Sequence, residues 1–226
     1  MQSPHSTNNC ANSTTPRSSS SSTQQQAPKL SSTPIIKHSH VIAPSIRNLI
    51  NQIDSIQSRS DVSDSQKSNL LGQLMKSFPL RNRDLKKYAL IEQSAPYTRN
   101  LIWETETYAL ILMCWKPRTD SVIHTHGGSS CWARVVNGEV SEKRYKMDPE
   151  TDEPLMLSQE VHEVGSVTYI DDSLGLHALC NPTNAFSMSL HLYTPPIRSS
   201  TYFDANDREM HVCHMKYHHK HHSTST

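Results

Sequence analysis

The sequence predicts a mainly β fold, in which a closed barrel or jelly roll of antiparallel strands carries a helical cap at its N-terminal end. Two observations lead to this prediction. Apolar residues recur at helical intervals from Ile42 to about Tyr88. After Tyr97, short runs rich in β-branched and aromatic residues are separated by turn-forming residues about every ten positions. About eight such runs in succession are typical of a barrel or jelly roll.

Residues 1–41 are expected to form a disordered leader. They consist largely of Ser, Thr, Gln, Asn and Pro, and such a segment cannot bury a core. A Ser-rich segment with no acidic residue before Asp54 also resembles a mitochondrial transit peptide, but its basic residues are sparse, so we expect a cytoplasmic protein. Residues 42–217 are expected to form one folded domain, and residues 218–226 a frayed, His-rich tail.

Composition argues against several classes of function. The formal net charge of +1 gives no field for nucleic acid or an anionic membrane, and no run of about 18 apolar residues could cross a bilayer. The five cysteines are odd in number and lack C-x-x-C spacing, which argues against a disulfide framework or a structural zinc site. We expect a reducing intracellular compartment and a monomer.

Three helical segments should form the cap. The first begins near Pro44 and repeats isoleucine and leucine at helical spacing as far as Ile53. The second spans residues 63–78 with Ser63 or Asp64 as its cap, and residues 82–88 form a shorter third turn. The expected strands are 98–103, 108–115, 131–137, 139–147, 156–161, 167–170, 177–181 and 185–193, with an Asn-Gly hairpin turn at 137–138.

His124 and His126 give the first chemical signal. They lie two residues apart in an apolar-flanked run that is expected to be a strand, so both imidazoles should project from one face. Two neutral ring nitrogens on a rigid strand suit a borderline metal ion. A solvent-exposed or hydrogen-bonded pair is the ordinary alternative for an isolated H-x-H.

The wider spacing favours the metal. The pattern H-x-H-x(4)-C-x(6)-G runs from His124 through Cys131, and G-x-H-x(3)-N surrounds His177. This resembles the two-part metal motif of the cupin superfamily, H-x-H-x(3,4)-E-x(6)-G followed by G…H-x(3)-N, with Cys131 in place of the usual glutamate ligand. Three neutral histidines would leave a divalent ion its full charge and open positions for an anionic substrate.

With Cys131 in that position the resemblance narrows to the cysteine dioxygenase family of mammalian type. Five segments resemble it in the same order: Y-T-R-N-L (97–101), L-M-C-W (112–115), I-H-T-H-G-G-S-S-C (123–131), D-S-L-G-L-H (172–177) and S-L-H-L-Y-T-P-P (189–196). The resemblance covers roughly residues 42–220, weakly over the helices and strongly over the barrel. It implies a cupin jelly-roll β-barrel and a non-haem Fe(II) enzyme of cysteine catabolism, which oxidises L-cysteine with O₂ to the sulfinate.

The resemblance also implies roles for individual residues. By position, His124, His126 and His177 match the iron ligands, Arg99 matches the residue that pairs with the substrate carboxylate, and Tyr97 lines that site. Cys131 and Tyr193 match a pair that becomes joined by a thioether in many members, and Ser189 and His191 match the chain that leads to this tyrosine. Trp115 and Met215 fall at pocket positions, while Ser200 stands near where many relatives have a cysteine at the substrate entrance.

The residues alone allow other readings. Ser189, His191 and Tyr193 alternate, so they share one strand face and can form a hydrogen-bonded row, although such a row is more often the solvent face of a strand. A guanidinium such as that of Arg99 can bind a carboxylate through two hydrogen bonds, but it can equally form a surface ion pair. A dioxygenase for 3-mercaptopropionate or cysteamine and a non-catalytic metal-binding cupin are the alternative functions. Cys114 and Cys180 are expected to be buried and inert.

Overall fold

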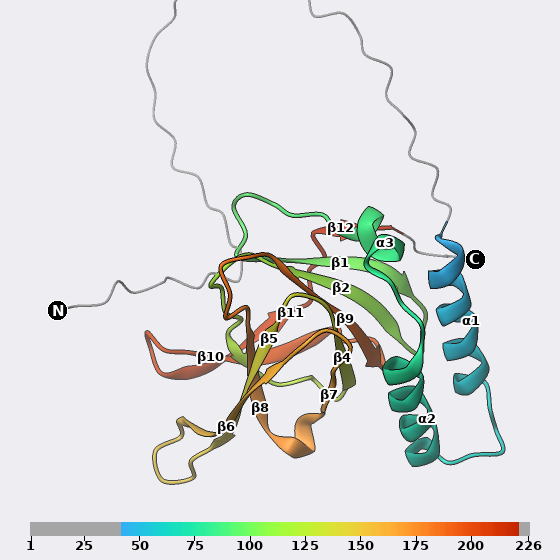
Figure 1. Cartoon of the computed structure of the whole chain (residues 1–226). Coiled ribbons are helices and arrows are strands. Elements are labelled where there is room, and N and C mark those ends of the chain that lie inside the picture. The colour runs from blue at the N-terminus through green and yellow to red at the C-terminus, as the bar shows by residue number, and fades with distance from the viewer. Residues whose placement is uncertain (1–41, 222–226) are drawn as a thin grey trace, which may run out of the picture. The chain divides into compact units, whose positions relative to one another are not determined.

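A computed structural model describes residues 42–221. In this part of the chain, two six-stranded β-sheets face each other as a barrel, and helices precede them in the sequence (Figure 1). This is the mainly β cupin fold, a double-stranded β-helix with N-terminal helices, as the sequence predicts. The expected leader, 1–41, and the last part of the expected tail, 222–226, lie outside the described residues. No helix in the described part of the chain is long and apolar enough to cross a membrane.

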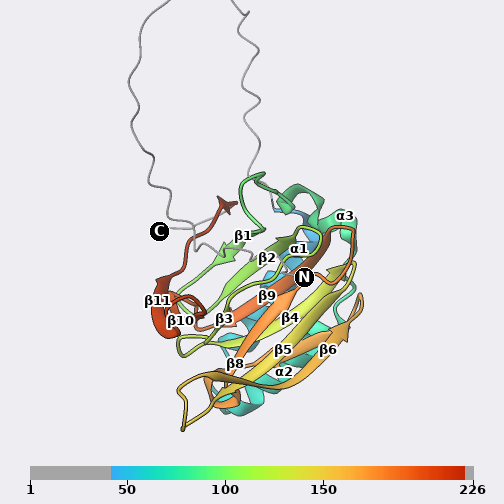
Figure 2. The same cartoon turned by 90° about the vertical axis from the view of Figure 1, so that its left-hand side faces the viewer.

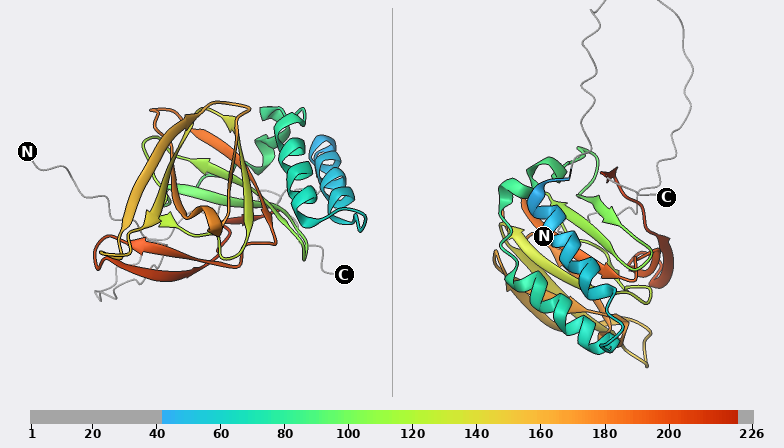
Figure 3. Two further views of the ribbon diagram at one scale, coloured as in Figure 1. Left: turned by 90° about the horizontal axis from the view of Figure 1, so that it is seen from below. Right: turned by 90° about the vertical axis from the view of Figure 1, so that its right-hand side faces the viewer.

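The helices cover one face of the barrel. They are α1 (Pro44–Gln57), α2 (Asp64–Ser77), α3 (Asn82–Leu85) and the 3-10 turn η1 (Lys86–Tyr88), close to the expected bounds. Ser63 caps α2 in a capping box, because its hydroxyl accepts from Gln66 N–H while the Gln66 side chain accepts from Ser63 N–H. Figure 3 shows α1 and α2 side by side against the barrel wall.

The first sheet has the order β12-β1-β2-β9-β4-β7. Its strands are β1 (Tyr97–Glu104), β2 (Ala109–Trp115), β4 (Ser130–Asn137), β7 (Val167–Ile170), β9 (Ser187–Thr194) and β12 (His219–Lys220). This sheet is buried on both sides. Leu190 and Leu192 of β9 pack outward in the core cluster that includes α1 and α2, whereas Tyr193 belongs to the cluster inside the barrel. Every residue of β2 is buried for the same reason.

The second sheet has the order β11-β10-β3-β8-β5-β6 (Figure 2). Its strands are β3 (Ile123–His124), β5 (Val140–Met147), β6 (Pro154–His162), β8 (Leu176–Cys180), β10 (Ser199–Asp204) and β11 (Glu209–His214). The outermost strand β6 is largely exposed. All eight expected strands are therefore present, and β5 and β4 are joined at the expected Asn137-Gly138 turn, where Gly138 has φ of 66°.

The structure differs from the sequence expectations in three places. The strand that carries the paired histidines ends at His124, so His126 follows in a loop. The hairpin of β10 and β11 is not among the expected strands. Residues 218–221 are not frayed, since β12 pairs in parallel with β1, with Asn100 opposite His219. This pairing satisfies backbone N–H and C=O groups along the outer side of β1. No local sequence pattern reveals the pairing.

Candidate metal centre

Three histidines converge inside the barrel. His124 ends β3, His177 lies directly opposite it on β8, and His126 follows in the next loop. Their ring centroids are 4.7 Å apart for His124 and His177, 4.7 Å for His126 and His177, and 5.4 Å for His124 and His126. One nitrogen from each ring lies within 4.8 Å of the other two. Three such donors in a buried space form a metal site of the kind that the sequence predicts.

A tight turn brings His126 into this group even though it lies outside the strand. The carboxylate of Asp172 accepts the backbone N–H groups of His126, at 2.6 Å, and Gly128, at 2.7 Å. Gly127 has φ of 56°, and a Cβ atom there would clash with the carbonyl oxygen of Ser199. Both the positive φ and the close approach to Ser199 therefore require glycine at this position. Asp172 anchors the loop to the turn that precedes β8.

Hydrogen bonds aim the histidine rings. His124 Nδ1 lies 2.9 Å from the carbonyl oxygen of Val122, and His177 Nδ1 lies 2.7 Å from Glu142 Oε1. These contacts leave the Nε2 atoms of both rings available to a metal. Both ring nitrogens of His126, which is fully buried, lack a hydrogen-bond partner within residues 42–221. A buried imidazole without a partner is costly, and a bound metal ion would remove that cost, so the residues present fit a metal.

Glu142 is a functional residue that the sequence reasoning missed. It is 3 % exposed and holds His177 from the side away from the site. Burial opposes its charge, but the hydrogen bond and charge of His177, the hydroxyl of Thr168 and the charge of Arg144 together lower the pKa of Glu142 to about 2. A detectable signal existed, because Glu142 shares the inward face of β5 with buried Val140, where an acidic residue needs a partner.

The site favours neutral imidazoles. Burial, followed by the charge of His177, lowers the pKa of His124 to about 3, and burial likewise lowers the pKa of His126. The His191 pKa falls to about 3, mainly through burial. Only the unprotonated ring can donate a lone pair to a metal, so His124 and His126 are poised to bind one at neutral pH.

A hydrogen-bonded row runs beside the three histidines. Trp115 Nε1 donates to Ser189 Oγ at 2.9 Å, Ser189 Oγ lies 2.7 Å from His191 Nε2, and His191 Nδ1 lies 3.4 Å from the Tyr193 hydroxyl. The ring of Tyr193 stacks at 6.2 Å on that of His126. The alternating residues of β9 therefore face the barrel interior, and the solvent-face alternative is wrong.

Cys131 lies in this row and outside the group of metal donors. It pairs across the sheet with Tyr193, and its Sγ atom is 3.7 Å from His191 Nδ1. Burial raises the pKa of the Cys131 thiol. Burial, with a smaller contribution from Cys131, also raises the pKa of Tyr193 well above its ordinary value, so the phenol keeps its proton at neutral pH.

Arg99 and Tyr97 are adjacent on one face of β1. Arg99 Nη2 donates to the Tyr97 hydroxyl at 3.1 Å, and the guanidinium lies 4.9 Å from the centre of the Tyr97 ring. That ring in turn packs on Trp115 at 4.8 Å. Both residues are half-buried, and the charge of Arg99 is close enough to contribute, after burial and His177, to the lowered pKa of His124. A positive group thus lies at the edge of the metal site.

The remaining predicted residues lie around this region. Met215 is partly buried against the inner core cluster, and Ser200 lies on β10, paired with Cys213 of β11. Cys114 and Cys180 are buried and free, as expected.

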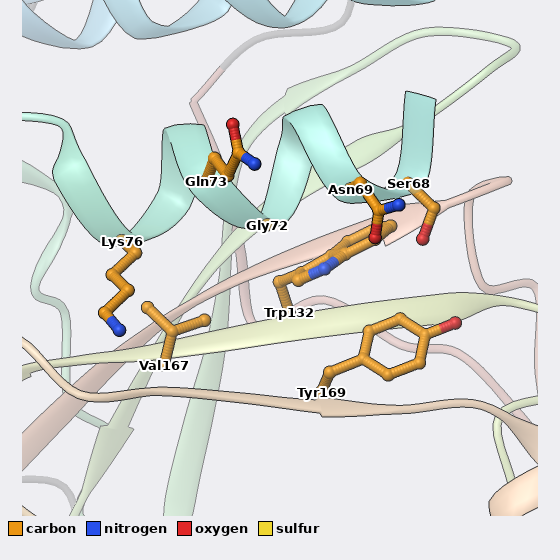
Figure 4. Close-up of a pocket in the computed structure, with 8 residues that line it drawn as sticks. All are labelled: Ser68, Asn69, Gly72, Gln73, Lys76, Trp132, Val167 and Tyr169. Atoms are coloured by element: carbon orange, nitrogen blue, oxygen red, sulfur yellow. The ribbon is translucent and has the colours of Figure 1, made fainter. Parts of the chain in front are cut away.

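Two further features stand apart from the site. A shallow cavity of about 380 Å³ lies outside the barrel between α2 and the strands β4 and β7, where Trp132 and Tyr169 form its floor (Figure 4). Asp204, Asp207 and His211 group on the β10–β11 hairpin. Their carboxylates already accept hydrogen bonds from the hairpin backbone or from His211.

Comparison with known proteins agrees with this geometry. Residues 35–206 match the sequence model of the family described as "Cysteine dioxygenase type I". The chain is 34 % identical over 146 residues to cysteine dioxygenase type 1 of Danio rerio, covering 63 % of this chain and 72 % of that protein. It is 29 % identical over 150 residues to the Homo sapiens protein of the same name, covering 65 % and 74 %.

Among solved structures, a conserved Klebsiella pneumoniae protein with a double-stranded β-helix domain is 13 % identical, with a TM-score of 0.41 over 49 % of this chain and 81 % of that one.

Proposed function

Because the chain belongs to the cysteine dioxygenase type I family, we propose that it is a non-haem Fe(II) thiol dioxygenase that oxidises L-cysteine with O₂ to cysteine sulfinate. The donor set is the observation that carries the proposal. Three imidazoles form the metal group, and the cysteine that replaces the usual carboxylate of such motifs lies in the buried row of β9 instead. An anionic thiolate substrate can then provide the negative donor that the protein lacks.

Fe(II) would be held by His124, His126 and His177. When bound there, Fe(II) would supply open coordination positions, a lowered thiol pKa and the electrons that activate O₂. The chain supports this by bringing one ring nitrogen from each histidine together inside the barrel. Glu142 holds the ring of His177 and Asp172 holds the backbone of His126, so both ligands are positioned before a metal arrives.

Arg99 would select for the substrate carboxylate. A guanidinium can form two parallel hydrogen bonds to a carboxylate, and this fixes which end of a small amino acid faces the metal. The Tyr97 hydroxyl, 3.1 Å from the guanidinium, supports it from one side. Thiols without a carboxylate could not form this pair of hydrogen bonds to the guanidinium, so they should bind more weakly.

Tyr193 would donate a hydrogen bond into the reaction space. Its raised pKa keeps the proton on the phenol. Ser189 holds the His191 ring at Nε2, and the Nδ1 atom of that ring faces the Tyr193 hydroxyl. A donor held in a buried, preorganised position stabilises developing negative charge far better than water does. Its role is therefore to position and polarise, and the high pKa disfavours a role as a base.

The decisive experiment measures oxygen consumption and cysteine sulfinate formation by the Fe(II)-loaded full chain. We expect coupled uptake and sulfinate, and loss of both in His177→Ala, which removes one of three ligands. An exposed histidine, His214, provides the matched control as His214→Ala. Sulfinate from 3-mercaptopropionate or cysteamine but not from L-cysteine would move the assignment to another thiol. No oxygen uptake with any thiol would favour a non-catalytic metal-binding cupin.

A further inference from the structure

The C-terminal segment forms a strap along the edge of β1. Residues 215–221 form this strap. Residues 218–221 run beside β1, which carries Tyr97 and Arg99, and β12 is the part that pairs with it (Figure 1). The His221 N–H donates to the carbonyl oxygen of Leu101 at 2.9 Å. Met215 and Tyr217 pack against the core cluster inside the barrel. The strap thus contacts both the sheet and the interior.

His218 hydrogen-bonds both backbone polar groups of Arg99, the N–H and the carbonyl oxygen. The Arg99 N–H donates to His218 Nδ1 at 3.0 Å, and the His218 N–H donates to the Arg99 carbonyl oxygen at 2.9 Å. These contacts join residues 119 positions apart in the chain. Both hydrogen-bonding groups of the Arg99 backbone are therefore used by one residue of the strap.

The strap is fastened on either side of His218. The hydroxyl of Tyr217 donates to Glu104 Oε1 at 3.3 Å, and the same oxygen accepts from Arg198 at 2.6 Å. On the other side, His219 lies 3.7 Å from Glu92. Burial lowers the pKa of His218, so its ring is neutral at pH 7 and Nδ1 can accept the Arg99 N–H. His218 is thus held where its ring reaches β1.

We propose that His218 is a positioning residue for the substrate carboxylate, acting through Arg99. The inference rests on the proposed function, in which Arg99 binds the carboxylate of L-cysteine. A bidentate guanidinium contact tolerates displacements of only about 0.5 Å, so a shift of β1 on the side where only the short β12 pairs with it would weaken the contact. His218 removes that freedom by closing both backbone hydrogen bonds at Arg99. It touches neither the metal site nor the substrate.

The test measures anaerobic binding of L-cysteine and cysteamine to the Fe(II)-loaded full chain. Cysteamine has the same thiol and amine without the carboxylate, so the ratio of the two dissociation constants reports the Arg99 contact. We expect His218→Ala to weaken L-cysteine binding about three- to tenfold, the effect of losing one hydrogen bond, and to leave cysteamine binding and iron content unchanged. His218→Asn should restore the ratio, because its Oδ1 atom can replace Nδ1 as the acceptor.

Two controls make the result specific. Lys216→Ala alters an exposed residue of the same strap and should keep the wild-type ratio. Amide hydrogen exchange should rise in His218→Ala for peptides that cover β1, which tests the contact without substrate. An unchanged ratio, or equal weakening of both thiols, would overturn the inference. Failure of the proposed function would show differently, since the unsubstituted protein would then bind the two thiols equally.

Discussion

Cys131 and Tyr193 lie directly opposite each other on the neighbouring strands β4 and β9, and both are buried. Side chains that face each other across an antiparallel pair have Cβ atoms about 5 Å apart, so the sulfur can reach the tyrosine ring. This register sets the geometry that a thioether between them needs. It also places Cys131 beside Tyr193 and outside the group of three metal donors.

The first prediction is that a thioether forms between these two residues in iron-loaded protein exposed to O₂ and L-cysteine. Joining the sulfur to the ring removes one hydrogen atom from each residue, with O₂ as the oxidant. Mass spectrometry of peptides should find residues 131 and 193 in one linked species that lacks two hydrogen atoms. The Cys131→Ser variant should never give this linked species, whereas the Cys114→Ser variant should form it as the unsubstituted protein does. Unlinked peptides after many turnovers would contradict the prediction.

A second prediction concerns the acid that holds His177. Glu142→Gln removes the charge that orients this ring and should weaken Fe(II) binding about 10- to 100-fold, the usual effect of losing such an outer partner. The weakened Fe(II) binding is measured as the iron stoichiometry that remains after dialysis against a competing chelator. Glu160 is the matched control, because it lies opposite Glu142 in the β5–β6 register but is exposed. Equal iron retention by Glu142→Gln and Glu160→Gln would show that the carboxylate has no such role.

The elements that the sequence reveals are those with a local pattern. The helical spacing of isoleucine and leucine and the turn-bounded strands identify α1 and β9 without knowledge of their partners. His124 and His177 could also be assigned, because their motifs keep a fixed spacing within short segments. Residues whose role depends on distant contacts leave no such trace.

Glu142, Asp172 and His218 are examples of that second kind. Glu142 is separated from His177 by 35 positions and His218 from Arg99 by 119, so only the fold brings them together. Asp172 occurs within a motif, but its function is to accept amide hydrogens of a loop 44 to 46 residues earlier. The short length of β3 follows from the same loop, since the glycines after His126 end the strand.

A third prediction separates two adjacent glycines. Gly127 and Gly128 both have positive φ, but a Cβ atom at Gly127 would meet the Ser199 carbonyl, whereas no atom of residues 42–221 lies within 4 Å of one at Gly128. Gly128→Ala should lower the free energy of unfolding by about 1 kcal/mol, the conformational cost alone. Gly127→Ala should cost more and should also reduce iron binding, because the loop that positions His126 must move. Thermal unfolding with and without Fe(II) compares the two. Similar losses in both variants would argue against the close contact.

The last prediction concerns metal removal. A metal that binds only the folded chain stabilises it by RT ln(1 + [L]/Kd), which is about 2.7 kcal/mol at a free concentration a hundredfold above the dissociation constant. Adding Fe(II) under anaerobic conditions should therefore raise Tm by several degrees, and a chelator should reverse the shift. His126 should contribute strongly, since both of its ring nitrogens are buried and have no hydrogen-bond partner within residues 42–221. In His126→Ala the shift should nearly disappear, whereas His211→Ala, altered in the β10–β11 hairpin, should retain it. A shift that survives in His126→Ala and is lost in His211→Ala would place the metal on the hairpin instead.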